Sequence, residues 1–408
     1  MMKVLINAYA CSPNKGSEPG MAWNWCIHLA KYCELHIITE GEFRDEIEET
    51  VLLLPQGENM YFYYNPLPKE VRKMCWNQGD WRFYRHYKNW QFKTYQIANE
   101  IIKTNKIDIL HQLNMIGFRE PGYLWKIKEI PFVWGPVDAK QNFPVSYLDG
   151  TSLKTKIFIN LKNIITYFQL KYSKRIRLAA KKASVIVSAS TNSQVSFSRF
   201  FGVQSPLLNE TGCYLQEHEI KNKKTKKKLD LLWVGKLDFR KQLSIAIKTL
   251  AKINNTEVVL HIVGAGDNAF YKSLAKEVGV ESQCRWYGLV NHNEVQDMMK
   301  KCDLLFFTSV AEGTPHVVLE AIGNNLPVLC FNTCGQGDSI NEKVGVKIEL
   351  SNPEQSTVDF SKKIQDLFDN RHSIELMAIN CKEHQENLSW ERKALDMFEL
   401  YKGVLVKD

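Results

Sequence analysis

Residues 229–263 read LDLLWVGKLDFRKQLSIAIKTLAKINNTEVVLHIV, and this stretch decides the fold class. Apolar runs predict strands over Leu229–Val234 and Val258–Val263, and helical spacing of apolar residues predicts a helix over Leu243–Ile253. The alternation continues with a helix over 270–278, a strand over 303–307, a helix over 316–324 and a strand over 326–331. Strands that alternate with helices indicate an α/β domain with a parallel sheet covered on both faces.

The first half of the chain repeats this architecture. We expect a helix over 20–32 and strands over 3–6, 35–39, 107–110, 131–134 and 184–188. A chain of 408 residues is too long for one compact core. Two α/β domains of roughly 200 residues each are therefore expected.

The composition excludes several classes of protein. Hydrophobic residues make up 44% and charged residues 24% of the chain, so large disordered regions are not expected. No apolar run reaches the roughly 18 residues of a membrane-spanning helix, and the N-terminus does not resemble a signal peptide. None of the ten cysteines forms a C-x-x-C pair, which favours free thiols and a cytoplasmic protein.

The net charge of +8 would suit nucleic acid, an anionic membrane surface or phosphorylated substrates. Segment 154–182 mixes apolar with basic residues, and it is interpreted as an amphipathic helix that lies on a membrane or on the protein itself. The aromatic segment 74–102 is expected to be helical and to pack on the sheet. A base-stacking surface is the alternative, although no nucleic-acid-binding motif accompanies it. The run KNKKTKKK at 221–228 is interpreted as a solvated linker.

The segment SVAEGTPHVVLEAIGNNLP at 309–327 carries the strongest chemical signal. It holds two glutamates, Glu312 and Glu320, with seven residues between them. Thr314 is expected to cap a helix whose first residue is Pro315. The free N–H groups and the dipole of that helix would favour a diphosphate, and Glu320 could accept hydrogen bonds from ribose hydroxyls. Two surface glutamates beside a capped helix are the alternative.

This E-x7-E pattern resembles the signature of the GT4-type (group 1) retaining glycosyltransferases. Other segments resemble the family in the same order along the chain. Gly235-Lys236-Leu237 and Lys241 resemble its G-R-L-x-x-x-K element, with Lys236 in place of arginine. Such cations would neutralise charge that develops on a departing diphosphate. Lysine keeps the charge but lacks the bidentate fork of arginine.

Three further segments carry the resemblance. Gly264-Ala265-Gly266 resembles a loop near the nucleotide base, and Leu289 would lie beside the base. A tight strand-to-helix turn is the alternative reading of the G-x-G pattern. Gly16-Ser17 resembles a glycine-rich loop after the first strand, where glycine would allow close approach to the donor.

His111 ends the expected strand 107–110, and family members often carry a histidine there that faces the sugar. A lone histidine at a strand end can equally be structural. Two departures from the family pattern are clear. Asp138 and Ala139 replace glycines of a W-G-P-x-G-G element, and Asp338 stands where a glutamate is usual.

The resemblance implies an α/β protein of the GT-B fold, with two Rossmann-like parallel-sheet domains that face a cleft. An acceptor domain would span 1–207, a donor domain 208–388, and a helix over 389–408 would pack back on the first domain. The donor would be a UDP- or GDP-linked sugar, and the acceptor a glycan or lipid-linked glycan of a surface polysaccharide. No metal or other cofactor and no nucleic acid is expected, and contact with an anionic membrane is possible.

The implied catalytic residues are Glu312, His111 and Lys241. The implied donor-binding residues are Gly16, Ser17, Gly235, Lys236, Lys241, Gly264, Gly266, Leu289, Gly313, Thr314, Pro315, His316 and Glu320. The alternatives are a sugar-nucleotide 2-epimerase and a nucleic-acid-binding or scaffold protein on an inactive fold. Epimerases lack this ordered set of motifs, whereas salt-sensitive DNA binding without sugar-nucleotide binding would favour the scaffold.

Overall fold

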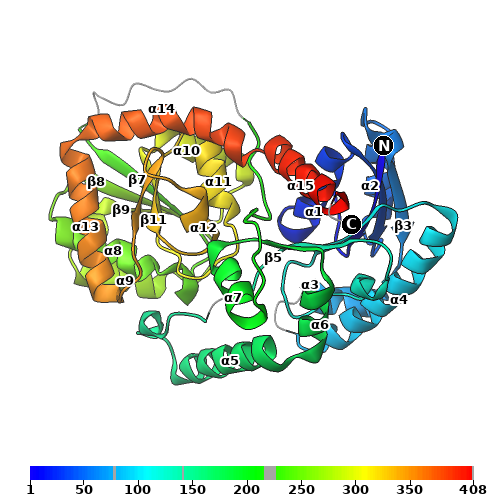
Figure 1. The fold of residues 1–408 in the computed structure, drawn as a ribbon. Coiled ribbons are helices and arrows are strands. Elements are labelled where there is room, and N and C mark those ends of the chain that lie inside the picture. Colours follow the sequence, from blue (N-terminus) through cyan, green and yellow to red (C-terminus); the bar gives the residue numbers. More distant parts are fainter. Residues whose placement is uncertain (77–79, 140–141, 216–226, 407–408) are drawn as a thin grey trace. The chain divides into compact units, whose positions relative to one another are not determined.

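The structure, a computed structural model, describes residues 1–76, 80–139, 142–215 and 227–406 (Figure 1). The chain divides into two compact units, each with its own sheet. The first unit comprises residues 1–141, 166–211 and 390–408, and the second comprises 142–165 and 212–389. Residues 142–165 thus group with the second unit, although the domain boundaries expected from the sequence placed them in the first. The predicted linker at 221–228 lies mostly outside the described residues.

The sheet of the first unit has six parallel strands in the order β3-β2-β1-β4-β5-β6. Their bounds are β1 Met2–Ala8, β2 Cys33–Thr39, β3 Met60–Tyr64, β4 Ile109–Asn114, β5 Phe132–Val137 and β6 Val185–Ser188. Because side chains alternate between the faces of a strand, neighbouring apolar residues build two separate cores. Val4 and Ile6 face one core, whereas Leu5 faces the other.

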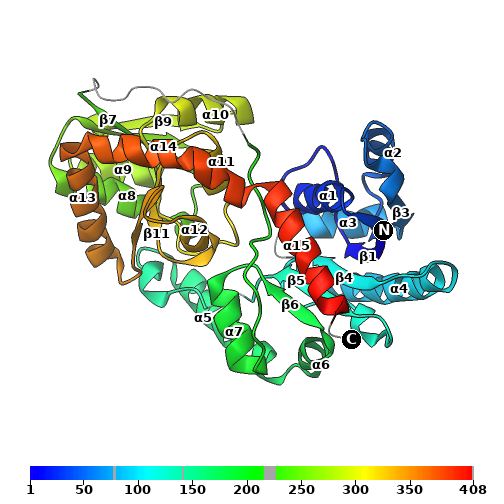
Figure 2. The same ribbon diagram turned by 45° about the horizontal axis from the view of Figure 1, so that its top comes forward.

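Helices cover both faces of this sheet. They are α1 Ser17–Leu29, α2 Arg44–Val51, α3 Lys69–Trp76, α4 Phe83–Thr104, α6 Lys174–Lys182, α7 Thr191–Phe201 and α15 Trp390–Leu405, with short 3-10 turns at Gly57–Asn59 and Leu124–Lys126. Helix α15, at the end of the chain, packs along α1 (Figure 2). The rings of Trp25 and Trp390 meet edge to face at 5.9 Å, so the last helix completes this core.

The second unit has a six-stranded parallel sheet in the order β12-β11-β10-β7-β8-β9. Its strands are β7 Leu229–Val234, β8 Val258–Val263, β9 Cys284–Gly288, β10 Leu304–Phe307, β11 Val328–Phe331 and β12 Gly345–Ile348. Its helices are α8 Leu243–Ile253, α9 Ala269–Glu277, α10 His292–Lys301, α11 His316–Gly323, α12 Cys334–Ser339, α13 Pro353–Asp369 and α14 Arg371–Leu388, with 3-10 turns at Val145–Leu148, Phe239–Lys241 and Glu281–Gln283. Helices α8, α9 and α13 contribute to one core, α10 and α11 contribute to the other, and α14 contributes to both.

Both sheets therefore have the same topology. Counted along each half of the chain, the strand order is 3-2-1-4-5-6, which is the order of the Rossmann fold. In such sheets the connections leave in opposite directions on either side of the first strand. Ligands bind where the carboxyl ends of the first and fourth strands open this crevice. The expected sites therefore lie after β1 and β4 in the first unit, and after β7 and β10 in the second.

The basic segment 154–182 forms two helices where the sequence predicted one. Helix α5 spans Leu153–Tyr172, and α6 starts at Lys174. They separate at Ser173, whose backbone is extended. The side-chain oxygen of Ser173 caps α6 by accepting a hydrogen bond from the Ile176 N–H at 3.5 Å. In the described part of the chain, no helix combines the length and the apolar character needed to cross a membrane.

Candidate functional site

The loops after β7 and β10 of the second unit hold the residues with the strongest predicted roles. After β7 the chain passes Gly235 and forms a 3-10 turn, Phe239–Lys241. A side chain at Gly235 would lie 3.3 Å from Cδ of Lys241, so the glycine leaves room for the lysine to lie across it. The Lys241 ammonium also lies 5.1 Å from the centre of the Phe307 ring at the end of β10. The lysine is thereby directed along the carboxyl end of the sheet.

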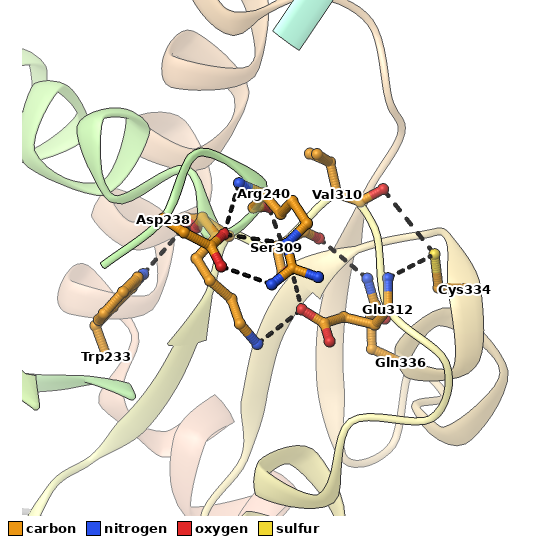
Figure 3. Close-up of polar contacts among 10 residues, drawn as sticks. Trp233, Asp238, Arg240, Ser309, Val310, Glu312, Cys334 and Gln336 are labelled. Carbon is orange, nitrogen blue, oxygen red and sulfur yellow. Dashed lines mark hydrogen bonds and ion pairs between the residues drawn. The ribbon is translucent and has the colours of Figure 1, made fainter. Parts of the chain in front are cut away.

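Glu312 lies in the loop after β10 and meets this lysine. Nζ of Lys241 and Oε1 of Glu312 are 2.7 Å apart, and both side chains are about four-fifths buried. The Ser309 hydroxyl donates a hydrogen bond to the same carboxylate oxygen (Figure 3). Two motifs that are 71 positions apart in the sequence thus form one charged pair at the topological switch point of the sheet.

Further hydrogen bonds fix the two loops to each other. The Thr308 hydroxyl donates to the carbonyl of Lys241 at 2.8 Å and accepts from the indole N–H of Trp233 at 3.0 Å. The Val310 N–H donates to the carbonyl of Arg240 at 3.0 Å. The charged pair therefore rests on a braced backbone rather than on two free loops.

The side chain of Arg240, next to Lys241, forms an ion pair with Asp238. Its Nη2 lies 2.6 Å from Oδ2 of Asp238 (Figure 3). Burial alone would raise the pKa of Asp238, but the hydrogen bonds and charge of Arg240 outweigh burial and lower this pKa. Arg240 thus forms a local pair with Asp238, and Lys241 is the cation that Glu312 contacts.

The predicted anion-binding helix α11 begins one residue later than expected. Its first residue is His316, Pro315 occupies the N-cap position, and no side chain caps it. The prediction that Thr314 caps the helix is therefore wrong, because Thr314 precedes the cap. Gly313 and Thr314 instead pack against the first turn of α12. The Gly335 N–H donates a hydrogen bond to the Gly313 carbonyl at 3.0 Å, and a side chain at Gly335 would meet Cα of Thr314 at 2.5 Å.

Gly264 and Gly266 bring the loop after β8 against the loop after β7. Gly264 has φ of +155°, and a Cβ atom there would lie 1.7 Å from the carbonyl oxygen of Gly235. Gly266 has φ of +138°, and its Cβ would lie 2.7 Å from that of Leu237. Only glycine fits these positions, so the G-x-G pattern is needed for loop packing whatever it binds.

The remaining predicted residues of the second unit are spread along its loops and helix. Lys236 is exposed, and Leu289, between β9 and α10, is 80% exposed. Glu320 is half-buried on α11 and accepts from the side-chain amide of Gln296 at 3.4 Å. Their proposed contacts with a nucleotide remain predictions.

In the first unit, the loop after β1 differs in one detail from the expectation. Gly16 has φ of −86°, a conformation open to any residue, whereas Ser17 has φ of +56°. The left-handed residue is therefore the serine that begins α1, and not the glycine. A strained residue of this kind at the carboxyl end of a sheet is typical of functional loops.

His111 lies in the middle of β4, between Ile6 of β1 and Val133 of β5, so the prediction that it ends its strand is wrong. The strand continues because its polar side chains find partners: Gln112 accepts from the side-chain amide of Asn7 at 2.9 Å. Both ring nitrogens of His111 are engaged in the buried core. Nε2 donates to the Gly135 carbonyl, and Nδ1 accepts from the Tyr401 hydroxyl at 2.6 Å.

Burial lowers the pKa of His111 to about 4, although the Gly135 carbonyl partly opposes this effect. The imidazole is therefore neutral near pH 7, with its proton on Nε2. The prediction that this residue takes part in catalysis stays a prediction. Its position supports a structural role, because its hydrogen bond to Tyr401 connects α15 to the centre of the sheet.

Two features of the site were not anticipated from the sequence. Ser309 and Thr308 hold Glu312 and Lys241, and the only signal for them was two polar residues directly after a buried strand. Cys334 of α12 also reaches the site, since the Glu312 N–H lies 3.5 Å from its sulfur (Figure 3). Within the described residues, no group of three or more histidine, cysteine or acidic side chains is placed to hold a metal ion.

Residues 216–384 match the family model described as glycosyl transferases group 1. The lipopolysaccharide glucosyltransferase WaaG of Escherichia coli K12 is 31% identical over 130 residues, which are 31% of this chain and 33% of that protein. An uncharacterized glycosyltransferase of Methanocaldococcus jannaschii is 27% identical over 178 residues, which are 42% of this chain and 44% of that protein. The matched segment spans less than half of the length of these curated relatives.

Solved structures resemble the chain over nearly its whole length. The lipopolysaccharide outer core galactosyltransferase WaaB in its apo form has a TM-score of 0.64 at 16% identity, covering 97% of this chain and 98% of that one. Anabaena HepE in complex with UDP and glucose has a TM-score of 0.56 at 15% identity, covering 99% and 100%. The likeness confirms the expected α/β fold of the GT-B type.

Proposed function

Because residues 216–384 match the family model of the glycosyl transferases group 1, we propose that the protein transfers a sugar from a nucleoside-diphosphate donor to a glycan or lipid-linked glycan. The observation that carries this proposal is the Lys241–Glu312 pair at the switch point of the second sheet, in which Glu312 lies in the loop that leads into α11. A cation and free helix N–H groups favour a diphosphate, and a carboxylate suits the sugar hydroxyls.

In this proposal each group has a separate task. Lys241 and segment 314–316, which leads into α11 and ends at its first residue, stabilise the departing diphosphate, with Lys236 as a second cation. Glu312 orients the sugar or stabilises positive charge at its anomeric carbon, and it does not act as a nucleophile. Gly235, Gly264 and Gly266 allow the backbone to approach the nucleotide, with Leu289 beside the base and Glu320 at the ribose.

We propose a retaining reaction by front-face attack. The acceptor oxygen forms a bond to the anomeric carbon while the bond from that carbon to the phosphate oxygen breaks. The departing phosphate takes the acceptor proton. Because lysine and helix N–H groups supply the positive charge, the proposed reaction needs no divalent metal.

HepE was crystallised with UDP and glucose, and WaaG is named for lipopolysaccharide glucose transfer. HepE thus supports the UDP-linked form of the proposed UDP- or GDP-linked donor, and WaaG supports an acceptor in surface polysaccharide synthesis. The proposed place of action is the cytoplasm, at the inner face of the membrane.

Helix α5 supports membrane contact. It buries Ile159, Thr166 and Leu170 and exposes a continuous apolar stripe, whose members are each about half or more exposed: Leu153, Ile157, Phe158, Leu161, Ile164, Ile165, Phe168 and Tyr172. Residues 150–209 contain ten lysines and arginines and no acidic residue. An exposed apolar stripe in a segment whose charged residues are all basic is complementary to the surface of an anionic membrane.

The donor assignment is tested by a thermal-shift screen with nucleoside diphosphates and sugar nucleotides, with and without EDTA. A saturable rise in Tm with one UDP- or GDP-sugar, unchanged by EDTA, is the expected result, because a ligand that binds only the folded state stabilises it. If no sugar nucleotide changes Tm, the proposed donor site is wrong, and the scaffold alternative gains support. A shift that EDTA abolishes would contradict the metal-independent mechanism.

A further inference from the structure

Among the residues that line a cavity at the switch point of the first sheet, only Ser17 has been given a role above. A cavity of about 220 Å³ opens where β1, β2 and β4 end. It is lined by Tyr9, Ala10, Cys11, Ser17, Glu18, Pro19, Thr39, Glu40, Gly41, Glu42, Phe43, Cys75, Trp76 and Met115. Pockets for drug-sized ligands usually measure about 300–1,000 Å³, so this volume suits a single ring rather than a chain of rings.

One wall of the cavity is aromatic and held in a fixed orientation. Trp76, at the end of α3, is 51% exposed, and its ring meets Phe43 edge to face at 6.2 Å. The indole N–H donates to both carboxylate oxygens of Glu42, at 3.1 and 3.0 Å. A half-exposed indole held in this way presents a flat apolar surface to whatever occupies the cavity.

The base of the cavity is rigid. Tyr9 is buried, and its ring packs edge to face against Tyr87 at 5.0 Å and Trp90 at 4.9 Å. Glu40 is also buried: it accepts from the Leu67 N–H at 2.5 Å and from Arg72 at 2.9 Å. Both side chains therefore have fixed positions before any ligand arrives.

The charge of the lining selects the ligand. Three of the lining residues are glutamates, Glu18, Glu40 and Glu42, and none is a lysine or arginine. Two cations lie beside the cavity: Arg72 is paired with Glu40, and the Lys15 ammonium lies over the ring of Phe43, 5.8 Å from its centre. A phosphate or uronate ring would meet like charge here, whereas carboxylates accept hydrogen bonds readily from hydroxyl groups.

We propose that this cavity binds one hydroxyl-bearing sugar ring without negative charge, which stacks on Trp76 and donates hydroxyl hydrogen bonds to the glutamates. This proposal rests on the proposed function, in which the ring is the accepting end of the glycan. It narrows the acceptor to neutral sugars and excludes phosphorylated and uronic acid rings.

Two cysteines allow each site to be followed separately. All ten cysteines are free, and only Cys75 and Cys334 are partly exposed. Cys75 lines the cavity, and Cys334 contacts Glu312 in the second unit. Because burial raises the pKa of Cys75, alkylation by iodoacetamide is best followed at about pH 8.5, by peptide mass spectrometry.

The experiment compares four probes, the methyl glycosides of glucose and N-acetylglucosamine, methyl glucuronide and glucose 6-phosphate. If a neutral ring binds with a Kd of about 10 mM, about 50 mM of it slows alkylation of Cys75 roughly sixfold, and alkylation of Cys334 is unchanged. Trp76→Ala should abolish this protection. Trp81→Ala is the matched control, because Trp81 is 80% exposed and does not line the cavity.

Equal protection of Cys75 by the anionic sugars, or no protection by any of the four, would overturn the proposal. Protection that persists in Trp76→Ala would also overturn it. The donor site is scored independently, since a bound sugar nucleotide should slow alkylation of Cys334. Failure at Cys334 with protection at Cys75 therefore contradicts the proposed donor site alone.

Discussion

At the scale of single residues, the Lys241–Glu312 pair is the part of the site that defines its chemistry. Two opposite charges 2.7 Å apart and mostly buried hold each other in place before a donor binds. A diphosphate would compete with Glu312 for the lysine, so binding of the donor would release the carboxylate toward the sugar. The same pair thus prepares both groups for their proposed tasks.

Replacement of either partner tests these roles. Glu312→Gln and Lys241→Ala should each lower kcat by about 10²–10³, because each removes one charge that acts on the transition state. The measurement is sugar transfer from the donor found in the thermal-shift screen, with circular dichroism to confirm folding. Arg240→Ala is the matched control: its charge is engaged by Asp238, so its kcat should change much less. Near-normal turnover in both site variants would contradict the assignment.

His111 provides a prediction about stability. Its pKa falls from the ordinary value of 6.5 to about 4 in the folded protein, because burial disfavours the charged ring. The unfolded chain takes up a proton below about pH 6.5, whereas the folded protein does so only near pH 4. The neutral ring therefore stabilises the fold above pH 6.5, and this stabilisation is lost as the pH falls from about 6.5 to about 4.

Between about pH 7 and pH 5, the free energy of unfolding should fall by about 2 kcal/mol more in the native protein than in His111→Gln. Urea denaturation at both pH values measures this difference. His372→Gln is the control, because it makes the same substitution at an exposed histidine of α14. An identical pH dependence in the native protein and His111→Gln would show that the folded-state pKa of His111 is not lowered.

The roles of single residues could be predicted from the sequence where they depend on neighbouring residues in the chain. They could not be predicted where they depend on contacts between distant segments. A glutamate after an apolar strand and a lysine in a glycine turn were identified without the structure. The partners of His111 could not be, since Gly135 and Tyr401 are 24 and 290 positions away. The positive φ of Ser17 was likewise invisible, because the neighbouring glycine is the residue type that usually adopts it.

At the scale of secondary-structure elements, the strands for which no range was predicted from the sequence are β3, β9 and β12, and each lies at an edge of its sheet. An edge strand pairs on one side only and stays partly exposed. In β3 four of five residues are not fully buried, and β12 contains only four residues, Gly345–Ile348. The strands β3 (MYFYY) and β9 (CRWYG) contain no leucine, isoleucine or valine, and β12 (GVKI) is interrupted by Lys347. These aliphatic residues make up most of the central strands β7 and β8, whose bounds were predicted without error.

Helix α5 carries the element-scale prediction. Phe158→Glu with Leu161→Glu should reduce binding to anionic vesicles by about 10²-fold or more, because burial of each such side chain contributes about 1.5–3 kcal/mol. Sedimentation with phosphatidylglycerol vesicles at low salt measures the bound fraction. The native protein should also be released as salt is raised, since screening weakens its basic contacts.

The matched control for this prediction lies on another surface helix. Leu376 and Ile379 of α14 are about as exposed as Leu161 of α5, at 47%, 52% and 53%. Leu376→Glu with Ile379→Glu adds the same two charges, and it should bind vesicles like the native protein. If both double variants lose binding equally, general charge and not the α5 stripe is responsible. If the native protein ignores anionic vesicles, the membrane proposal fails.

At the scale of the whole molecule, one topology is used twice for different chemistry. Both sheets have the Rossmann strand order, and both open a site between the first and fourth strands. The second unit places a lysine and a helix N-terminus there, which suit an anion. The first unit places three glutamates and an indole there, which suit a neutral ring. The proposed division of donor and acceptor binding between the two units thus rests on the loop sequences and not on the fold.

This division predicts where a nucleotide protects the backbone. Since Lys236, Lys241 and the start of α11, which are proposed to stabilise the diphosphate, all belong to the second unit, UDP or GDP should slow amide hydrogen exchange in peptides that cover 235–241, 264–266 and 309–316. Helix α13, on the outer surface of that unit, is the internal control and should exchange at an unchanged rate. A ligand slows exchange only of those amides whose local opening would break contacts between the protein and the ligand. Most of the protection should therefore stay within these loops. Protection centred on the loop after β1 of the first unit would instead place the nucleotide at the cavity beside Trp76, and it would reverse the assignment of the two sites.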